Sequence, residues 1–129
     1  TLGLERNVTI LDFRDSHEEV IALMKAAEVF ALPSRREGFG ITVLEALAAG
    51  TPAVTIDHPG NAATALVSDG ETGYVVDAEP EPLASALEDA RTEIDPWTCR
   101  EAAADYDWDR IADRAERLYR AVVTGERAW

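Results

Sequence analysis

Hydrophobic and polar residues form blocks along the chain that predict strands and helices in alternation. The apolar run at residues 8–13 predicts a strand near the start. Residues 16–19, Ser-His-Glu-Glu, have the spacing of a capping box, in which the serine and the second glutamate bind the first N–H groups of a helix. Apolar residues then recur at helical spacing and predict one buried stripe, formed by Val20, Leu23, Met24 and Ala27 on a helix that ends near Glu28.

The middle of the chain continues this alternation with shorter elements. Two apolar runs without internal alternation, at residues 29–33 and 53–56, are typical of parallel strands covered on both faces. The helix between them should stop at Gly50-Thr51-Pro52, since glycine and proline end helices. A small helix near residues 61–67 and a strand at 74–76 follow. This order predicts an α/β fold built on a parallel sheet.

The last third of the chain is predicted to be helical. Two apolar stripes occur there at helical spacing, and Asp107 should cap the second helix. We expect both stripes, and the aromatic residues Trp97, Trp108 and Tyr119, to lie in the core. The stripes are formed by Leu83, Ala86, Leu87 and Ala90, and by Trp108, Ile111, Ala112, Ala115, Leu118, Tyr119 and Val122.

Composition limits the class of protein. The 129 residues suit one globular domain, with 47% hydrophobic and 29% charged residues. The 25 acidic and 12 basic residues give a net charge of −13, which argues against nucleic acid as a partner because a duplex would be repelled. An acidic surface of this kind suits high ionic strength, so we hypothesise a halophilic source.

The apolar runs and the cysteine count bear on localisation. No apolar run approaches the roughly 20 residues that span a bilayer. The single cysteine, Cys99, can form no disulfide within the chain, which favours a reducing compartment. We therefore expect a cytoplasmic protein. The start at Thr1 leads us to expect a longer parent, which could associate peripherally with a membrane.

The glycine-rich stretch after the strand at 29–33 is the candidate site. Its two glycines allow a tight turn and leave room for a ligand against the backbone. The turn should lie at the carboxyl edge of the sheet, where it runs into a helix. The first turn of a helix carries unpaired N–H groups and about half a positive charge. A phosphate over Gly40, Ile41 and Thr42 would therefore be stabilised without a basic side chain.

Glu37 and Glu45 bracket this turn and complicate a bare phosphate site. A carboxylate beside a phosphate is unfavourable unless it binds hydroxyl groups, and sugar hydroxyls are the obvious partners. A nucleotide sugar, with sugar, diphosphate and ribose in a line, would satisfy both glutamates and the helix dipole. Spacing alone leaves structural roles equally open. Glu37 could be a first-turn helix residue that favours the dipole, or the partner of Ser34 in another capping box, and Glu45 could be a solvated helix residue.

The segment PSRREGFGITVLEALAAGTPAV, residues 33–54, resembles the signature of GT-B glycosyltransferases of family 4. In that family a Pro-Ser pair, a glutamate, Gly-Phe-Gly, a second glutamate and a Gly-x-Pro-x-Val end occur in this order. The resemblance extends to DGETGYVV at residues 69–76 and, more loosely, to Trp108. It covers most of the chain.

This resemblance implies a Rossmann-like parallel sheet with flanking helices, part of the C-terminal, donor-binding domain of a GT-B enzyme. It implies sugar transfer from a nucleotide diphosphate sugar, usually with retention, and neither a cofactor nor an obligatory metal. Glu37 would be the catalytic residue and hold hydroxyls of the donor sugar, while Glu45 would hold the ribose hydroxyls. The donor-binding turn would comprise Gly38, Phe39, Gly40, Ile41 and Thr42, with the N–H groups from Phe39 onward carrying the diphosphate.

One departure from the family pattern lies in the loop after the strand at 53–56. The family commonly has a Gly-Gly pair and a glutamate there, whereas this chain has HPGNAATALV, with Ala65 near the position of the glutamate. His58 could reach the ligand instead, or be an ordinary loop histidine. His17, in the first turn of a helix, is expected to be solvated.

A second departure concerns the start of the domain. The family's donor domain opens with two further strand-helix units, which supply an arginine and a lysine to the diphosphate, and an acceptor-binding N-terminal domain precedes it. We expect residues 1–129 to be a donor-binding domain without those units, and catalytically silent alone. In the strand order 3-2-1-4-5-6, the absent strands separate residues 8–13 from 29–33. These two strands should therefore pair directly, or a homodimer should cover the exposed sheet edge.

A non-enzymatic binding or assembly module is the alternative hypothesis. In such a module the turn would be retained for its structural role. It should tolerate Glu37→Ala and Glu45→Ala without loss of ligand affinity, whereas a donor site should not.

Overall fold

The computed structural model describes residues 2–125 of the chain. The elements alternate between helix and strand over the first two thirds and are helical thereafter, as the hydrophobic pattern predicts. In chain order they are α1 (His17–Ala26), β1 (Phe30–Leu32), α2 (Ile41–Ala49), β2 (Ala53–Ile56), the 3₁₀ helix η1 (Ala62–Leu66), β3 (Gly73–Val76), α3 (Pro80–Glu93), α4 (Pro96–Ala104) and α5 (Trp108–Thr124).

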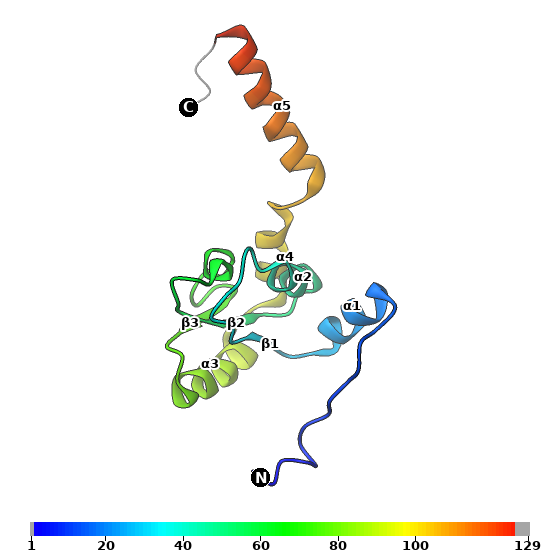
Figure 1. Cartoon of the computed structure of the whole chain (residues 1–129), viewed down its shortest axis with the longest axis vertical. Coiled ribbons are helices and arrows are strands. Elements are labelled where there is room, and N and C mark those ends of the chain that lie inside the picture. Colours follow the sequence, from blue (N-terminus) through cyan, green and yellow to red (C-terminus); the bar gives the residue numbers. More distant parts are fainter. Residues whose placement is uncertain (1, 126–129) are drawn as a thin grey trace.

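The three strands form one parallel sheet in the order β1-β2-β3, which confirms the predicted α/β class (Figure 1). Ala53 at the start of the central strand pairs with Phe30 on one side and with Gly73 on the other. Every residue of β2 is buried, which explains its apolar sequence without alternation. Gly73 is required at this seam, because a Cβ there would lie 1.7 Å from the carbonyl oxygen of Ala53.

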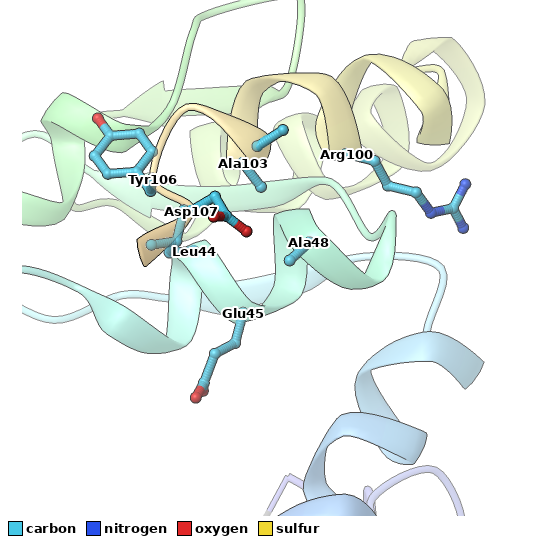
Figure 2. Close-up of a pocket in the computed structure, with 8 residues that line it drawn as sticks. Leu44, Glu45, Ala48, Arg100, Ala103, Tyr106 and Asp107 are labelled. Carbon is cyan, nitrogen blue, oxygen red and sulfur yellow. The ribbon is translucent and has the colours of Figure 1, made fainter. Parts of the chain in front are cut away.

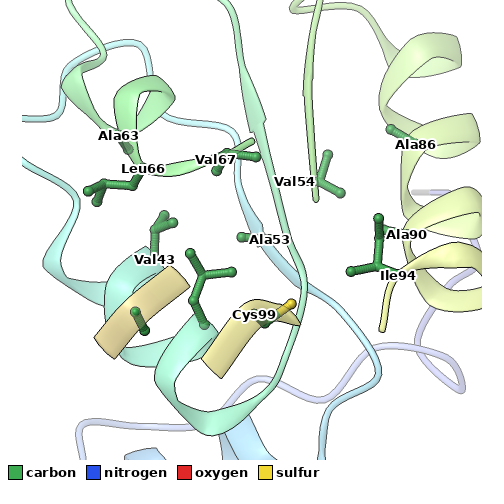
Figure 3. Packing of buried hydrophobic residues seen from close by; sticks show 12 residues of the cluster. Val43, Ala53, Val54, Ala63, Leu66, Val67, Ala86, Ala90, Ile94 and Cys99 are labelled. Atoms are coloured by element: carbon green, nitrogen blue, oxygen red, sulfur yellow. The ribbon is translucent and has the colours of Figure 1, made fainter. Parts of the chain in front are cut away.

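Helices cover both faces of the sheet, with α2 and α4 on one face and α3 on the other (Figures 1 and 3). Val43 and Leu47 from α2, Val54 from β2 and Ala90 from α3 belong to one buried cluster, which also contains Cys99 of α4. The small residues Ala86 and Ala90 of α3 and Ala103 of α4 belong to the same cluster. The core therefore lies on both sides of β2, and α2, which follows the candidate turn, contributes Val43 and Leu47 to it.

Helix α1 begins where the sequence predicts, but without the predicted capping box. Ser16 is the N-cap residue, yet its side chain accepts no N–H of the helix, and the Glu19 carboxylate lies 4.0 Å from Arg14 instead. The helix packs on α2 and buries fully only Met24 of its predicted stripe; Leu23 remains exposed. A short helix that packs through one side needs only a narrow apolar face.

The predicted strand at residues 8–13 is wrong. The segment has no strand pairing, and its apolar side chains, such as Ile10 and Phe13, are exposed. A strand is stable only when another strand receives its backbone hydrogen bonds, and this segment does not reach β1. Direct pairing with β1 is therefore also wrong, while a homodimer through the exposed edge stays a prediction.

The prediction that the last apolar stripe lies in the core is also wrong. Helix α5 extends away from the sheet (Figure 1), and none of its residues is buried. Trp108 and Tyr119 keep 80% and 71% of their surface exposed, and Trp97 on α4 is exposed as well. Asp107 does cap α5, because its side chain accepts the N–H of Asp109. Among the helices of residues 2–125, none combines the length and the apolar character that a membrane span requires.

Candidate functional site

The turn that enters α2 depends on a glycine at its last position. Gly40 is the N-cap residue and has a φ of 89°, a left-handed conformation that side chains disfavour. A Cβ on Gly40 would also lie 2.5 Å from the Cβ of Ala63 in η1. The turn and η1 are thus in close contact, and the start of α2 is held against the segment that follows β2.

Backbone hydrogen bonds join Glu37 to the same segment. The Glu37 N–H donates to the carbonyl oxygen of Gly60 at 2.9 Å, and the Ala62 N–H donates to the carbonyl oxygen of Glu37 at 3.0 Å. Glu37 and Asn61 form a parallel bridge through these bonds. Because Gly60 follows the carboxyl end of β2, Glu37 lies at the carboxyl edge of the sheet, as predicted from the sequence.

The Glu37 carboxylate folds back over its own turn. Its Oε1 accepts the N–H of Gly40 at 3.1 Å and that of Phe39 at 3.4 Å. Two of the amides predicted to carry a diphosphate therefore already converge on one carboxylate oxygen. The alternative pairing with Ser34 does not form, because the Ser34 hydroxyl donates to the carbonyl oxygen of Arg36.

The next two N–H groups, those of Ile41 and Thr42, are unpaired. Within residues 2–125 no group accepts a hydrogen bond from either, whereas the Val43 N–H donates to the carbonyl oxygen of Gly40 at 2.9 Å. Unpaired N–H groups at a helix start, with the helix dipole behind them, attract anions. The turn therefore presents two occupied and two free donors in succession.

Phe39, between the two glycines, is half exposed at the edge of this turn. Its ring meets that of Tyr106 edge to face, with centroids 6.2 Å apart. Tyr106 belongs to the turn between α4 and α5, so one aromatic contact joins the candidate site to the start of the last helix. A Cβ added to Gly38 would meet no other atom within 4 Å, so that side of the turn is open.

Glu45 lies one turn into α2 and faces α1. His17 is exposed to solvent, as expected, but its Nε2 also lies 3.3 Å from Oε1 of Glu45. Figure 2 shows the Glu45 side chain pointing away from Tyr106 and Asp107. Glu45 helps to line a hollow of about 300 Å³ between α2 and α4, and Glu37 is not among its lining residues. The two glutamates thus do not share this hollow.

Two residues of the β2–η1 loop have local structural contacts. His58 accepts the N–H of Gly60 on its Nδ1 at 3.0 Å, as an ordinary loop histidine does. Asn61 is 3% exposed and caps η1 by accepting the N–H of Ala63. The sequence predicts a short helix near residue 61, but the capping role of Asn61 was not predicted. The pattern that could have indicated it is an asparagine directly before a short helix. Among the described residues, no three His, Cys, Asp or Glu side chains gather in an arrangement that could hold a metal.

Comparison with known proteins identifies the family. The model of the family described as glycosyl transferases group 1 matches residues 1–104, which includes the whole sheet and the candidate turn. The chain belongs to the group 1 glycosyl transferases. This finding agrees with the resemblance of residues 33–54 and with the GT-B type of fold.

Curated relatives of this group 1 chain are several bacterial glycosyltransferases. The D-inositol 3-phosphate glycosyltransferase of Corynebacterium efficiens is 34% identical over 97% of this chain and 30% of its own length. The phosphatidyl-myo-inositol mannosyltransferase of Mycobacterium leprae is 37% identical over 95% of this chain and 34% of its own. The glycogen synthase of Mycobacterium tuberculosis is 34% identical over 86% and 28%. The chain therefore spans about a third of the length of these relatives.

A solved structure shows the same arrangement. The sucrose-phosphate synthase of Thermosynechococcus elongatus superposes with a TM-score of 0.76 and 30% sequence identity, covering 95% of this chain and 32% of that one. Both the sheet and its helices are thus found in a larger enzyme of known structure.

Proposed function

We propose that this chain is the donor-binding part of a family 4 glycosyltransferase that takes a sugar from a nucleotide diphosphate sugar, with retention and without an obligatory metal, in the cytoplasm. The observation that carries the proposal is the run of four N–H groups at the entry to α2. Those of Phe39 and Gly40 already bind a carboxylate oxygen, and those of Ile41 and Thr42 are free. This run suits an extended anion such as a diphosphate.

Charge development explains why such a turn would assist sugar transfer. When the bond between the sugar and the diphosphate breaks, negative charge builds on the departing diphosphate. Fixed N–H groups at the N-terminus of α2 stabilise this additional charge in the transition state more than they stabilise the bound ground state, and donors of this kind contribute about 3–4 kcal/mol each. Since Gly40 is locked against Ala63, the donors need not reorganise during the reaction.

Glu37 is assigned to the sugar through a change of partner. Its carboxylate and a diphosphate would repel each other at the same N–H groups. We propose that the diphosphate displaces the carboxylate from Phe39 and Gly40, and that the freed Glu37 then accepts hydrogen bonds from hydroxyls of the donor sugar. Gly38, the next residue, has open space around it, so a sugar has room beside the freed carboxylate.

Glu45 is assigned to the ribose hydroxyls of the nucleotide. Its carboxylate lies next to His17, which has a donor at Nε2 when that nitrogen carries the proton. His17 can then hold one carboxylate oxygen while the other accepts from ribose. Binding of the acceptor is assigned to the part of the relatives that this chain does not span. We therefore expect the 129-residue chain alone to transfer no sugar.

The test is calorimetric titration with UDP-, GDP- and ADP-glucose of the longest form of the protein that contains this chain. One of the three nucleotide sugars should bind. Glu37→Gln should lower the affinity for that nucleotide sugar more than the affinity for the matching nucleoside diphosphate, because the diphosphate lacks the sugar that Glu37 contacts. A matched control is Glu71→Gln, an exposed glutamate in the turn before β3. Absence of binding by all three nucleotides would end the proposal.

A binding or assembly module remains the second candidate, favoured by one observation. The Glu37 carboxylate itself accepts the N–H groups of Phe39 and Gly40 in the turn. If that is its whole role, Glu37→Ala and Glu45→Ala will leave nucleotide affinity unchanged while Glu37→Ala alone lowers thermal stability.

A further inference from the structure

We propose that Asn61 is a positioning residue: it holds the segment that carries Glu37 and Gly40 at the carboxyl ends of β1 and β2, so that the N–H groups of the turn are in place before a ligand binds. This inference rests on the proposed function. Asn61 does not itself face the open side of the turn, and it acts through the backbone of its neighbours.

The Asn61 side chain is buried, and both its amide nitrogen and its amide oxygen are hydrogen bonded. Its Nδ2 donates to Thr55 Oγ1 at 2.8 Å and to the carbonyl oxygen of Ile56 at 2.9 Å. Its Oδ1 accepts the N–H of Ala63 at 3.2 Å. An apolar replacement would leave buried polar groups on β2 and η1 without a partner, which is costly.

A second link extends this network to β1. The Thr55 hydroxyl, which accepts from Asn61, donates to the carbonyl oxygen of Leu32 at 2.9 Å. Leu32 is the last residue of β1, and residues 33–36 connect it to Glu37 and the candidate turn. Asn61 is therefore connected to the carboxyl ends of both strands that flank the turn.

Glu37 is bound to the chain on both sides of Asn61. The carbonyl oxygen of Glu37 accepts the Ala62 N–H, and the Glu37 N–H donates to the carbonyl oxygen of Gly60. The residues directly before and after Asn61 therefore fix the backbone of Glu37. The register of this bridge depends on where Asn61 places its own backbone. Loss of the Asn61 contacts should free the bridge while leaving the sheet paired.

The position of Ala63 depends on Asn61 as well. The N–H that Asn61 accepts belongs to Ala63, and Ala63 is the residue that packs against Gly40 at the start of α2. One side chain thus governs both contacts that hold the turn, the bridge at Glu37 and the packing at Gly40. Preorganised donors need no ordering when the ligand arrives, which favours affinity.

The test compares Asn61→Ala with Thr51→Val in the full chain. Thr51 is a matched control because it is also buried, and its hydroxyl donates to the carbonyl oxygen of Met24, away from the turn. Amide hydrogen exchange is followed by NMR at Glu37 and Ala62, whose N–H groups form the bridge. The exchange rate of each amide is divided by that of Leu47 in α2. This ratio should be about tenfold higher in Asn61→Ala than in Thr51→Val. Equal ratios in the two variants would overturn the proposal.

Nucleotide affinity gives the second measurement, with the nucleoside diphosphate that the wild type binds best. Affinity should fall about tenfold in Asn61→Ala and stay unchanged in Thr51→Val. If Asn61→Ala does not fold, Thr55→Val removes the link to β1 at almost constant volume and should accelerate exchange at the same two amides. A wild type that binds no nucleotide would refute the proposed function, while the exchange comparison would still decide the role of Asn61.

Discussion

The turn at the start of α2 and the helix α5 have equally clear sequence patterns, but only the turn is supported by packing. Gly40 and Glu37 are held by backbone bonds and by contact with η1, next to a buried cluster on β2. The apolar stripe of α5 is as regular as any in the chain, yet none of its residues is buried. An amphipathic pattern thus indicates which side of a helix is apolar, and says nothing of whether a neighbour is present to cover it.

The largest expected difference between the two regions is in the free energy of unfolding, when a leucine is replaced by alanine in each. Leu47→Ala removes a side chain that is 1% exposed in the core and should lower the free energy of unfolding by about 2–5 kcal/mol, because a cavity remains. Leu118→Ala on α5, where the leucine is half exposed, should change it by less than about 0.5 kcal/mol. Urea unfolding followed by far-ultraviolet circular dichroism measures both values. Similar losses in the two variants would mean that α5 packs against the rest of the protein in solution.

A smaller effect concerns Cys99, which lies in the same core. Burial, and secondarily Asp95, raises the pKa of its thiol from 9.0 to about 11. The unfolded chain therefore loses the thiol proton at lower pH than the folded chain, so this contribution to stability is complete below pH 9 and is lost as pH rises toward 11. The loss should be about 1 kcal/mol by pH 10, allowing for screening by solvent.

Comparison with Cys99→Ala isolates this thiol from the other groups that titrate at alkaline pH. The stability difference between the wild type and Cys99→Ala should shrink between pH 8 and pH 10, measured by urea unfolding at each pH. A constant difference would show that the thiol is not desolvated in the folded chain.

The last expected effect, of about the same size as that of the thiol, is that of salt, and it depends on where the acidic residues lie. Helix α5 carries four arginines and three acidic residues, so the acidic excess behind the net charge of −13 lies elsewhere. Molar potassium chloride should screen that repulsion and raise the melting temperature, by roughly 4 °C for a gain of about 1 kcal/mol. Equal stability in dilute buffer and in molar salt would remove the case for a halophilic protein.

Elements with local stop signals or continuous apolar runs could be predicted from the sequence. Helix α2 ends at Gly50 as expected, because a left-handed glycine before a proline terminates a helix wherever it occurs. Strand β2 was evident because a strand covered on both faces is apolar at nearly every position, here at all but Thr55. The segment at 8–13 and the stripe of α5 were mispredicted for one reason, since both require a neighbour that a local pattern does not reveal.

The candidate site also has some features that the sequence predicts and others that it does not. Gly40 and the helix start could be predicted, because backbone geometry at a turn restricts residue type. The fold-back of Glu37 and the contact of Glu45 with His17 could not, since each depends on the direction of a side chain and the second also on an element distant in sequence. The role of Asn61 could not be predicted either, because its partners, Thr55 and Ile56, come from the preceding strand.

The exposure of Trp97 and Trp108 has a practical consequence for spectroscopy. Indole emission shifts to longer wavelength when a tryptophan moves from an apolar interior to water, and these two rings are 62% and 80% exposed while the protein is folded. Their emission maximum should therefore resemble that of a free indole before any denaturant is added. A phenylalanine-to-tryptophan replacement at Phe30, which packs against the core beside β2, would give a fluorescent reporter of the interior.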